Sequence, residues 1–255
     1  MAQTREILKF AVETGDQLLR NGAEIYRVED TVMYILHQNG IEQCDVYVLS
    51  NGIFASANED LPDACSVIRH VPLGSVHLGR IAALNQLTRD VCEKRCSIED
   101  GWKRLELCRE LPLYKDWIQL AMCGVGSAGF CYLFGGNVFD AMIAFVIGML
   151  EQFVLAGCVK FHISRFVKNI IASGFVSLVC AGLGLAGMGM DWDKVIIGAI
   201  MPLVPGIAFT TAIRDFYNGD YLSGTIHLFD AVLTAVCIAV GSCLPLILRN
   251  ILVRM

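Results

Sequence analysis

Charge is scarce in the second half of this 255-residue chain. Residues 1–117 contain 13 Lys and Arg and 18 Asp and Glu, whereas the longer stretch 118–255 contains only 7 of each class. The hydrophobic fraction of the whole chain, 55%, lies above the usual value for soluble proteins. This division predicts a soluble part followed by a part that is embedded in a membrane.

Basic residues are not in excess. The net charge of −5 arises in the first part of the chain, so neither a nucleic-acid-binding face nor a polybasic lipid patch is expected. A secretory signal is also not readable, because Glu6, Glu13 and Asp16 precede any uninterrupted apolar run. We therefore expect the N-terminus to begin in the cytosol.

The motifs of common enzyme and metal sites are missing or out of place. The eleven cysteines are scattered and include no CxxC pair, which argues against a disulfide framework. Cys92 and Cys96 with His70 or His77 are the one metal alternative, and we expect no metal and no cofactor. A GxGxxG match at 124–129 lies inside an apolar stretch, where packing of small residues explains it better than nucleotide binding. No GxSxG motif supports a hydrolase, and an enzyme is not expected.

The first 112 residues predict an α+β domain of order ααβββαα. Asn51-Gly52 is a strong hairpin signal between two β-branched runs. Ser97 and Asp100 have the spacing of a helix N-cap. The expected helices are 4–20, 24–38, 77–95 and 98–110, and the expected strands are 44–50, 53–58 and 65–71.

One polar motif stands out in this domain, NGAEIYRVED at 21–30. Gly22 ends the first helix, and Glu24, Arg27 and Glu29 open the second. These charges can be a solvated first turn with acids favoured by the helix dipole, or a contact that docks or gates another part of the protein. The sequence leaves both interpretations open. Gly52, in the hairpin signal, is the other residue singled out here.

The second domain, 113–255, predicts an all-α membrane domain. A membrane-spanning helix needs about 20 mostly apolar residues. Five stretches qualify: 117–135, 138–157, 169–189, 195–213 and 221–248. Lys160, Arg165 and Lys168 lie between the second and third stretches, which places that loop and the N-terminal domain in the cytosol by the positive-inside rule.

The fourth stretch, IIGAIMPLVPGIAFTTAIRD at 196–215, carries Pro202, Pro205 and Gly206 at its centre. Each proline lacks an N–H and crowds the carbonyl four residues earlier, so the carbonyls of Gly198 and Met201 lose their usual donors. Unpaired peptide groups in hydrocarbon cost several kcal/mol unless neighbours, water or a ligand satisfy them. The PxxPG motif predicts a helix broken at mid-membrane, as in transporter substrate sites, with a simple proline kink as the alternative.

Ionisable side chains inside the apolar stretches strengthen the prediction of a polar path. An ionisable group in a span is costly and usually faces a cavity or a partner. Ser223, His227, Asp230 and Thr234 share one face of the fifth stretch, and Asp140 and Glu151 share one face of the second. Asp230 and Glu151 are expected to lie deepest. The candidate substrate and ion path comprises Pro202, Pro205, Gly206, Asp140, Glu151, Arg214, Asp215, Ser223, His227 and Asp230.

These stretches together resemble the threonine/serine exporters of the ThrE type and the related YjjP-type subunit of a split succinate exporter. The resemblance rests on NGAEIYRVED, NGIF at 51–54, VPLGSVHLGRIAALNQLTR at 71–89, PLVPGIAFTTAIRDFYNGDYLSG at 202–224, and Asp140. It implies a cytosolic domain followed by five membrane helices in the cytoplasmic (inner) membrane. It also implies a second small membrane subunit, a homo-oligomer, or both.

The expected function is secondary export of a small polar metabolite, most simply threonine or serine, coupled to protons through Asp230 or Glu151. Arg214 is expected to attract a carboxylate at the cytosolic mouth. A dicarboxylate such as succinate is the alternative substrate. The rival from another class is a membrane-anchored regulatory or enzymatic module in which residues 1–112 do the work.

Overall fold

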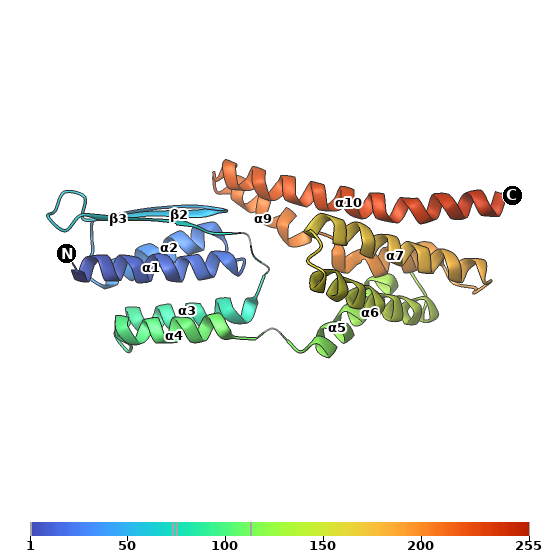
Figure 1. The fold of residues 1–255 in the computed structure, drawn as a ribbon, viewed down its shortest axis with the longest axis horizontal. Helices are drawn as coiled ribbons and strands as arrows, with labels where there is room; N and C mark the ends of the chain where they lie inside the picture. Colours follow the sequence, from blue (N-terminus) through green and yellow to red (C-terminus); the bar gives the residue numbers. More distant parts are fainter. Residues whose placement is uncertain (1, 73, 75, 113, 255) are drawn as a thin grey trace. The chain divides into compact units, whose positions relative to one another are not determined.

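A computed structural model describes residues 2–72, 74, 76–112 and 114–254 of the chain. These residues form ten α-helices, one short 3-10 helix and a three-stranded sheet (Figure 1). They divide into two compact units. The first contains residues 2–112 together with Thr211–Ile226, and the second contains residues 114–210 and 227–254. The end of the fourth predicted stretch and the start of the fifth therefore pack with the α+β domain.

The α+β domain contains its seven elements in the order expected from the sequence. Most of their ends lie within two residues of the expected ones. The bounds are α1 Ala2–Arg20, α2 Ile25–Gln38, β1 Cys44–Leu49, β2 Gly52–Ala57, β3 Cys65–His70, α3 Leu78–Cys92 and α4 Ile98–Glu110. Ser97 is the N-cap of α4, and its Oγ accepts a hydrogen bond from the Asp100 N–H at 3.1 Å, as its spacing predicted.

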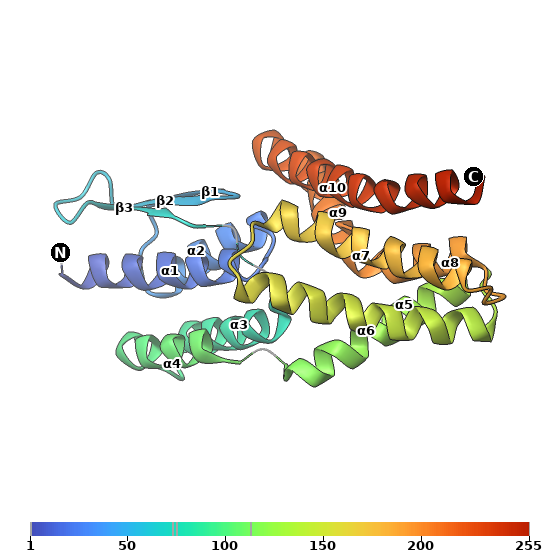
Figure 2. The same ribbon diagram turned by 45° about the vertical axis from the view of Figure 1, so that its right-hand side comes forward.

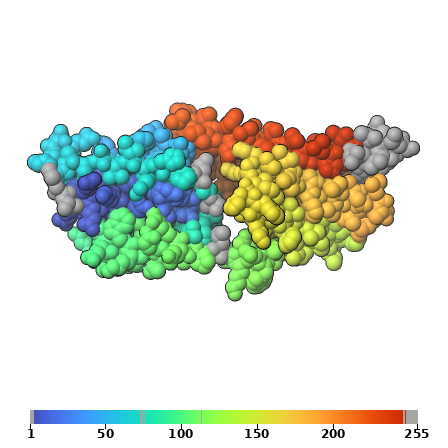
Figure 3. Space-filling view, in the orientation of Figure 1, coloured from blue at the N-terminus to red at the C-terminus, as the bar shows by residue number. Residues whose placement is uncertain are grey.

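Three layers make up this domain. The sheet covers one face of the α1 and α2 pair, and α3 and α4 cover the other (Figures 1 and 2). The space-filling view shows the same three bands of colour (Figure 3). Fully buried side chains from each layer meet in one core, among them Phe10, Leu36, Ile53, Leu84 and Leu105. Burial of this apolar surface is the main force that holds the layers together.

The β1–β2 hairpin differs by one residue from the sequence prediction, which placed the turn at Asn51-Gly52. In the structure Leu49 pairs with Gly52, so Ser50 and Asn51 form the turn and Gly52 begins β2. The third strand explains the shift, because Gly52 also pairs with His70 in β3. The Val71 N–H then donates to the Asn51 carbonyl at 2.8 Å. Pairing on both sides draws Gly52 into the ladder.

The second half of the chain is helical throughout. Its helices are α5 Asp116–Leu133, α6 Val138–Lys160, α7 Arg165–Leu185, α8 Trp192–Ile200, η1 Met201–Leu203, α9 Gly206–Tyr217 and α10 Tyr221–Arg254. Within the described residues, α6, α7 and the Tyr221–Pro245 part of α10 are long and apolar enough to cross a membrane. The bent pair of α8–η1 and α9 makes a fourth crossing if it counts as one span. The predicted count of five, which includes α5, is not confirmed.

Glycines allow the helices of the second unit to approach closely. A Cβ on Gly124 would lie 2.8 Å from the Phe145 carbonyl oxygen of α6, which supports the packing interpretation of the 124–129 motif. A Cβ on Gly241 of α10 would lie 2.4 Å from the Ile170 carbonyl oxygen and 2.1 Å from Ser173 Oγ, both on α7. A real Cβ atom does not come this close to another atom, so only glycine fits at these two positions and the helices approach closely there.

Candidate substrate and ion path

The PxxPG motif breaks the fourth apolar stretch. The axes of Trp192–Leu203 and Gly206–Tyr217 differ by 59°, so the predicted interruption is present. The two carbonyls that the prolines deprive of a partner nevertheless accept new hydrogen bonds. Met201 N–H donates to the Gly198 carbonyl, and Val204 N–H donates to the Met201 carbonyl at 3.1 Å. A tight 3-10 turn thus satisfies one lone pair of each carbonyl and leaves the second available.

The break has one packed side and one open side. Leu203 packs against Ala172 of α7 and Ile238 of α10, with Leu155 of α6 beside them. Pro202, Val204 and Gly206 are exposed, and a Cβ on Gly206 would meet no atom within 4 Å. The open side therefore has room for a ligand, lipid or another chain beside the first turn of α9.

Glu151 is buried inside the second unit. Its side chain has no exposed surface, and both carboxylate oxygens lack a hydrogen-bond partner among the described residues. It lies on the packed face of α6, together with Ala144, Ile147 and Gly148. An ionised carboxylate in this position would lose its hydration without gaining a partner, at a cost of at least several kcal/mol. The surroundings therefore favour a carboxyl group that has bound a proton or another cation.

Two apolar layers define the position of Glu151. Ile147, one turn before it, belongs to a buried cluster with Val176 of α7 and Ala199 of α8. Leu155, one turn after it, packs against the cluster that contains Leu203 of the break. Residues four apart on a helix share a face, so Glu151 lies between these layers. Glu151 is thus on the face of α6 that packs against α8 and η1, the first half of the broken segment.

Three hydroxyl groups of the second unit share the missing hydrogen bonds of Glu151. Ser127 Oγ of α5, Ser177 Oγ of α7 and Thr234 Oγ1 of α10 are buried and have no hydrogen-bond partner among the described residues. Ser127 lies against α6 at Gly148, where an added Cβ would be 2.2 Å from its Oγ. Sequence reasoning did not single out Ser127 or Ser177. Their signal was weak, because serine is common in packed membrane helices.

Asp140 has a different environment from Glu151, although both lie on one face of α6. One carboxylate oxygen accepts from the Asn137 N–H at 3.0 Å and completes a capping box at the start of α6. The other accepts from the Asp191 N–H at 2.9 Å, just before α8. Asp140 therefore joins the beginnings of two helices, a contact that its place in the expected ion path did not anticipate.

Asp230 has a charged partner that the sequence did not suggest. Its carboxylate forms an ion pair with Arg165, the first residue of α7, with 2.8 Å between the nitrogen and oxygen atoms. The side chain is partly exposed, whereas Thr234 one turn further along α10 is buried. The sequence did not predict this pair, because Arg165 was assigned to the loop between the second and third apolar stretches. Asp230 thus belongs to the same end of the bundle as the α6–α7 turn.

The remaining expected path residues lie with the α+β domain, because residues 211–226 pack there. Arg214 of α9 forms an ion pair with Glu24, and Asp215 is buried. Ser223 of α10 is buried, and its Oγ accepts from the N–H of Ser50 at 3.3 Å. His227, the first residue of α10 assigned to the second unit, is half-buried. The structure therefore brings two separate sequence motifs, 21–30 and 202–224, into contact.

The other residues of the 21–30 motif have distinct positions. Gly22 adopts φ +83°, and a Cβ there would lie 2.8 Å from Val76, so this turn requires glycine. Arg27 is exposed and forms a second ion pair with Glu24 at 3.3 Å. Glu29 is half-buried, and burial followed by the negative charge of Asp220 raises the pKa of its carboxyl group.

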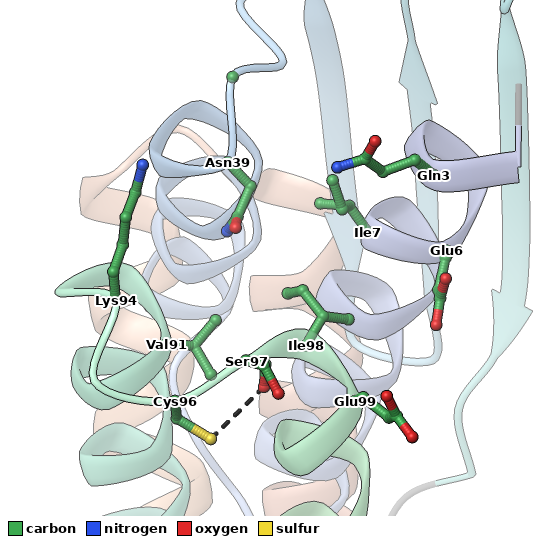
Figure 4. Close-up of a pocket in the computed structure, with 11 residues that line it drawn as sticks. Gln3, Glu6, Ile7, Asn39, Val91, Lys94, Cys96, Ser97, Ile98 and Glu99 are labelled. Carbon is green, nitrogen blue, oxygen red and sulfur yellow. Dashed lines mark hydrogen bonds between the residues drawn. The ribbon is translucent and has the colours of Figure 1, made fainter.

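A separate cavity of about 680 Å³ lies in the α+β domain, between the ends of its helices (Figure 4). Its lining includes Ile7 and Ile98, with Asn39, Lys94 and Glu99 around them (Figure 4). None of the expected path residues lines it. Across the described residues, no three His, Cys, Asp or Glu side chains are grouped as a metal site would require.

The structure has several apolar helices, a segment broken at PxxPG and a buried acid that finds no partner among the described residues. These features define a multi-pass membrane protein with the character of a transporter. Residues 9–248 match the ThrE family, described as "Putative threonine/serine exporter". The chain belongs to this family of threonine/serine exporters, and so to a family of transporters and not of enzymes.

Relatives with curated descriptions agree with this assignment. The chain is 23% identical to the "Probable succinate transporter subunit YjjP" of Escherichia coli over 94% of its own length and 93% of that protein. It is 21% identical to the same-named protein of Klebsiella aerogenes, with the same coverage of both chains. A protein of Schizosaccharomyces pombe described as uncharacterized is 27% identical, but the match covers 64% of this chain and only 21% of the yeast protein. No solved structure matches the chain.

Proposed function

We propose that this chain is a subunit of a secondary exporter in the cytoplasmic (inner) membrane. It exports threonine or serine in exchange for protons, together with a second small membrane subunit. The observation that carries the proposal is the carboxyl group of Glu151, which is fully buried and unpartnered within the described residues and lies beside the broken segment. The family assignment supports the direction of transport and the substrate class.

The proton site in this proposal is Glu151. The sequence left Asp230 and Glu151 as equal candidates. Asp230 has a positively charged partner, Arg165, 2.8 Å from its carboxylate. Glu151 has no such partner, so its charge is costly whenever the site is dry. Binding of a proton removes this cost when the site is closed to water, and release of the proton requires the site to open. Proton movement and the opening of the site are thereby linked, as proton-coupled transport requires.

The substrate site in this proposal is the break itself. The N–H groups of the first turn of a helix have no acceptor within the helix. Here the Gly206 N–H donates to the Val204 carbonyl at 2.8 Å, so the N–H groups of Ile207 and Ala208 are the ones offered to a ligand. Together with the positive end of the α9 dipole they favour a carboxylate. The second lone pairs of the Gly198 and Met201 carbonyls favour an ammonium group. An amino acid supplies both groups, which is why threonine or serine is the first candidate.

Succinate is the second candidate substrate, and a specific observation favours it. The chain matches proteins described as succinate transporter subunits over 93% of their length. The word subunit in those descriptions also supports a partner chain for this protein. The open side of the break at Pro202, Val204 and Gly206 is suited to a neighbouring chain, either that partner or a second copy.

The topology in this proposal places the α+β domain in the cytosol. The turn between α6 and α7 lies beside Lys160, Arg165 and Lys168, whereas the start of α8 carries Asp191 and Asp193 with only Lys194. Positively charged residues remain on the cytosolic side during insertion. An antibody epitope or a glycosylation acceptor placed in each connection measures the sidedness directly.

The test of the proposed function is efflux from membrane vesicles that contain the chain, with and without a candidate partner subunit. Labelled threonine, serine and succinate are loaded separately, and a proton gradient is then imposed. We expect gradient-driven efflux of threonine or serine that requires the partner. Efflux of succinate alone selects the second candidate. If none of the three substrates moves above the level of empty vesicles under any gradient, the proposed function is wrong.

A further inference from the structure

Glu151 lies nearer to one end of the second unit than to the other. It is nine residues before the end of α6 at Lys160 and thirteen residues after the start of α6 at Val138. At 1.5 Å of helix rise per residue, these spacings correspond to about 14 Å and about 20 Å. The nearer end is the one that carries the α6–α7 turn.

The apolar side chains that shield Glu151 are unequal on its two sides. Toward the α6–α7 turn they form a thin layer, whose described members are Leu155, Ala172, Ile200, Leu203 and Ile238. Three of these are buried. Toward the other end, the cluster that contains Ile147 has nine buried residues among those described, from four helices and the connection before α8. Fewer apolar side chains therefore separate Glu151 from the α6–α7 end.

Polar side chains continue from the thin layer toward that end. On α10, Thr234 lies one turn before Ile238 of the layer and is buried. On α7, Asn169 lies one turn after Arg165 and is also buried. Asp230 and Arg165 form the ion pair at the end, where their side chains are 20% and 50% exposed. We call Arg165, Asn169, Asp230 and Thr234 the polar seam.

The two helices that carry the polar seam face each other along it. The ion pair of Asp230 joins α10 to α7 at one end, and Gly241 of α10 lies against Ser173 of α7 at the other. Residues four apart on a helix share a face, so Asn169 and Thr234 lie on the facing sides between these contacts. Thr234 Oγ1 has no hydrogen-bond partner among the described residues. A hydroxyl group that lacks a protein partner inside a membrane domain is suited to bind water.

We propose that the polar seam is the route by which water and protons approach Glu151 from the α6–α7 end, and that the thin layer is the barrier across this route. Leu203 is the side chain that the broken segment supplies to the barrier, since it is the last residue of η1. The position of the barrier is a property of the second unit. Its use in coupling, with protons reaching Glu151 from the cytosol, rests on the proposed function.

The thin layer predicts which substitutions admit water to Glu151. A gap with only apolar walls stays dry, so the substitution must supply a polar group as well as space. Leu203→Ser does both within the thin layer, and Ile238→Ser is a second variant of the same kind. Ile147→Ser is the matched control, because it removes as many carbon atoms one turn from Glu151 but leaves the rest of the larger cluster in place.

Infrared spectroscopy of the full-length protein in lipid nanodiscs measures water access without any substrate. The C=O stretch of a protonated carboxyl group absorbs above the amide bands, and it moves to lower frequency when deuterium replaces the proton. The band that Glu151→Gln removes is the band of Glu151. After transfer to heavy water, we expect a slow shift of this band in the wild type and in Ile147→Ser, and a shift severalfold faster in Leu203→Ser and Ile238→Ser.

The polar seam is tested in the variant whose barrier is breached. Asn169→Leu, added to Leu203→Ser, fills the seam with an apolar side chain and should slow the shift again. A shift that stays fast in this double variant overturns the assignment of the route to the polar seam. The amide I band of the same spectra reports whether each variant keeps its helices.

The barrier and the proposed function fail in different ways. Equal rates in Leu203→Ser, Ile238→Ser and Ile147→Ser overturn the barrier, even in a protein that exports. If no carboxyl band is lost in Glu151→Gln, then Glu151 holds no proton, and both the route and the proposed proton site are wrong. The expected rates in a protein that exports none of the three substrates count against the proposed function alone.

Discussion

Glu151→Gln is the sharpest test of the proton site. Glutamine has nearly the volume of glutamic acid and stays neutral, so it resembles the protonated form of a side chain that is fully buried. Because neither carboxylate oxygen has a partner among the described residues, the substitution removes no protein hydrogen bond. We expect the free energy of unfolding to change by less than about 1.5 kcal/mol, as for volume-conserving core substitutions. The variant should therefore fold and allow transport to be measured.

The expected defect is a loss of coupling. One proton exchanged per substrate against a gradient of one pH unit supplies about 1.4 kcal/mol, which supports a substrate ratio of about tenfold across the membrane. In Glu151→Gln that ratio should fall to one, while exchange of labelled for unlabelled substrate at equal concentrations continues. Proteoliposomes with a defined internal pH measure both quantities. Asp230→Asn is the comparison variant, and it should keep the gradient response because its carboxylate is paired with Arg165. Tenfold accumulation that persists in Glu151→Gln refutes the reasoning.

Three further predictions concern the structure. Gly22→Ala should lower the free energy of unfolding by about 1–2 kcal/mol, seen as a lower midpoint in thermal unfolding, because φ is +83° and the new Cβ meets Val76. Asp140→Ala should lower the free energy of unfolding by about 1–3 kcal/mol, because it removes the acceptor for two backbone N–H groups. Transport per folded molecule should stay unchanged. A specific loss of transport would instead show that Asp140 takes part in the ion path. Burial raises the pKa of Cys92 to about 11, so at pH 8 only about one Cys92 thiol in a thousand is ionised. Maleimide at this pH should therefore label Cys96 before Cys92, which mass spectrometry of the peptides measures.

The sequence predicted the elements of the α+β domain well because their signals are local. Alternating residues, Asn-Gly turns and the Ser97 cap each act over a few positions. The hairpin turn was misplaced by one residue because Gly52 is drawn into β2 by its pairing with β3. No local pattern contains that information, since it depends on which strand lies on the other side.

The candidate path was predictable in part. Acids in a long apolar run pointed to Glu151 together with Asp140, and two prolines predicted the break. The sequence could not rank Glu151 above Asp230, because the partner of Asp230, Arg165, lies on a different helix. The pairing of Glu24 with Arg214 was equally invisible. Each residue had a sensible local explanation, and only the packing of residues 211–226 on the first unit joins them.

The backbone contact between α7 and α10 at Gly241 limits how the second unit can move. Gly241 of α10 touches α7 at Ile170 and Ser173, so any larger residue at position 241 would force the two helices apart. Gly174 of α7 lies at the same point, since a Cβ on it would be 3.3 Å from the Gly241 carbonyl oxygen. During an alternating-access cycle α7 and α10 should thus keep their contact at this crossing, whereas the break at PxxPG has no continuous helix to bend and is where we expect rearrangement.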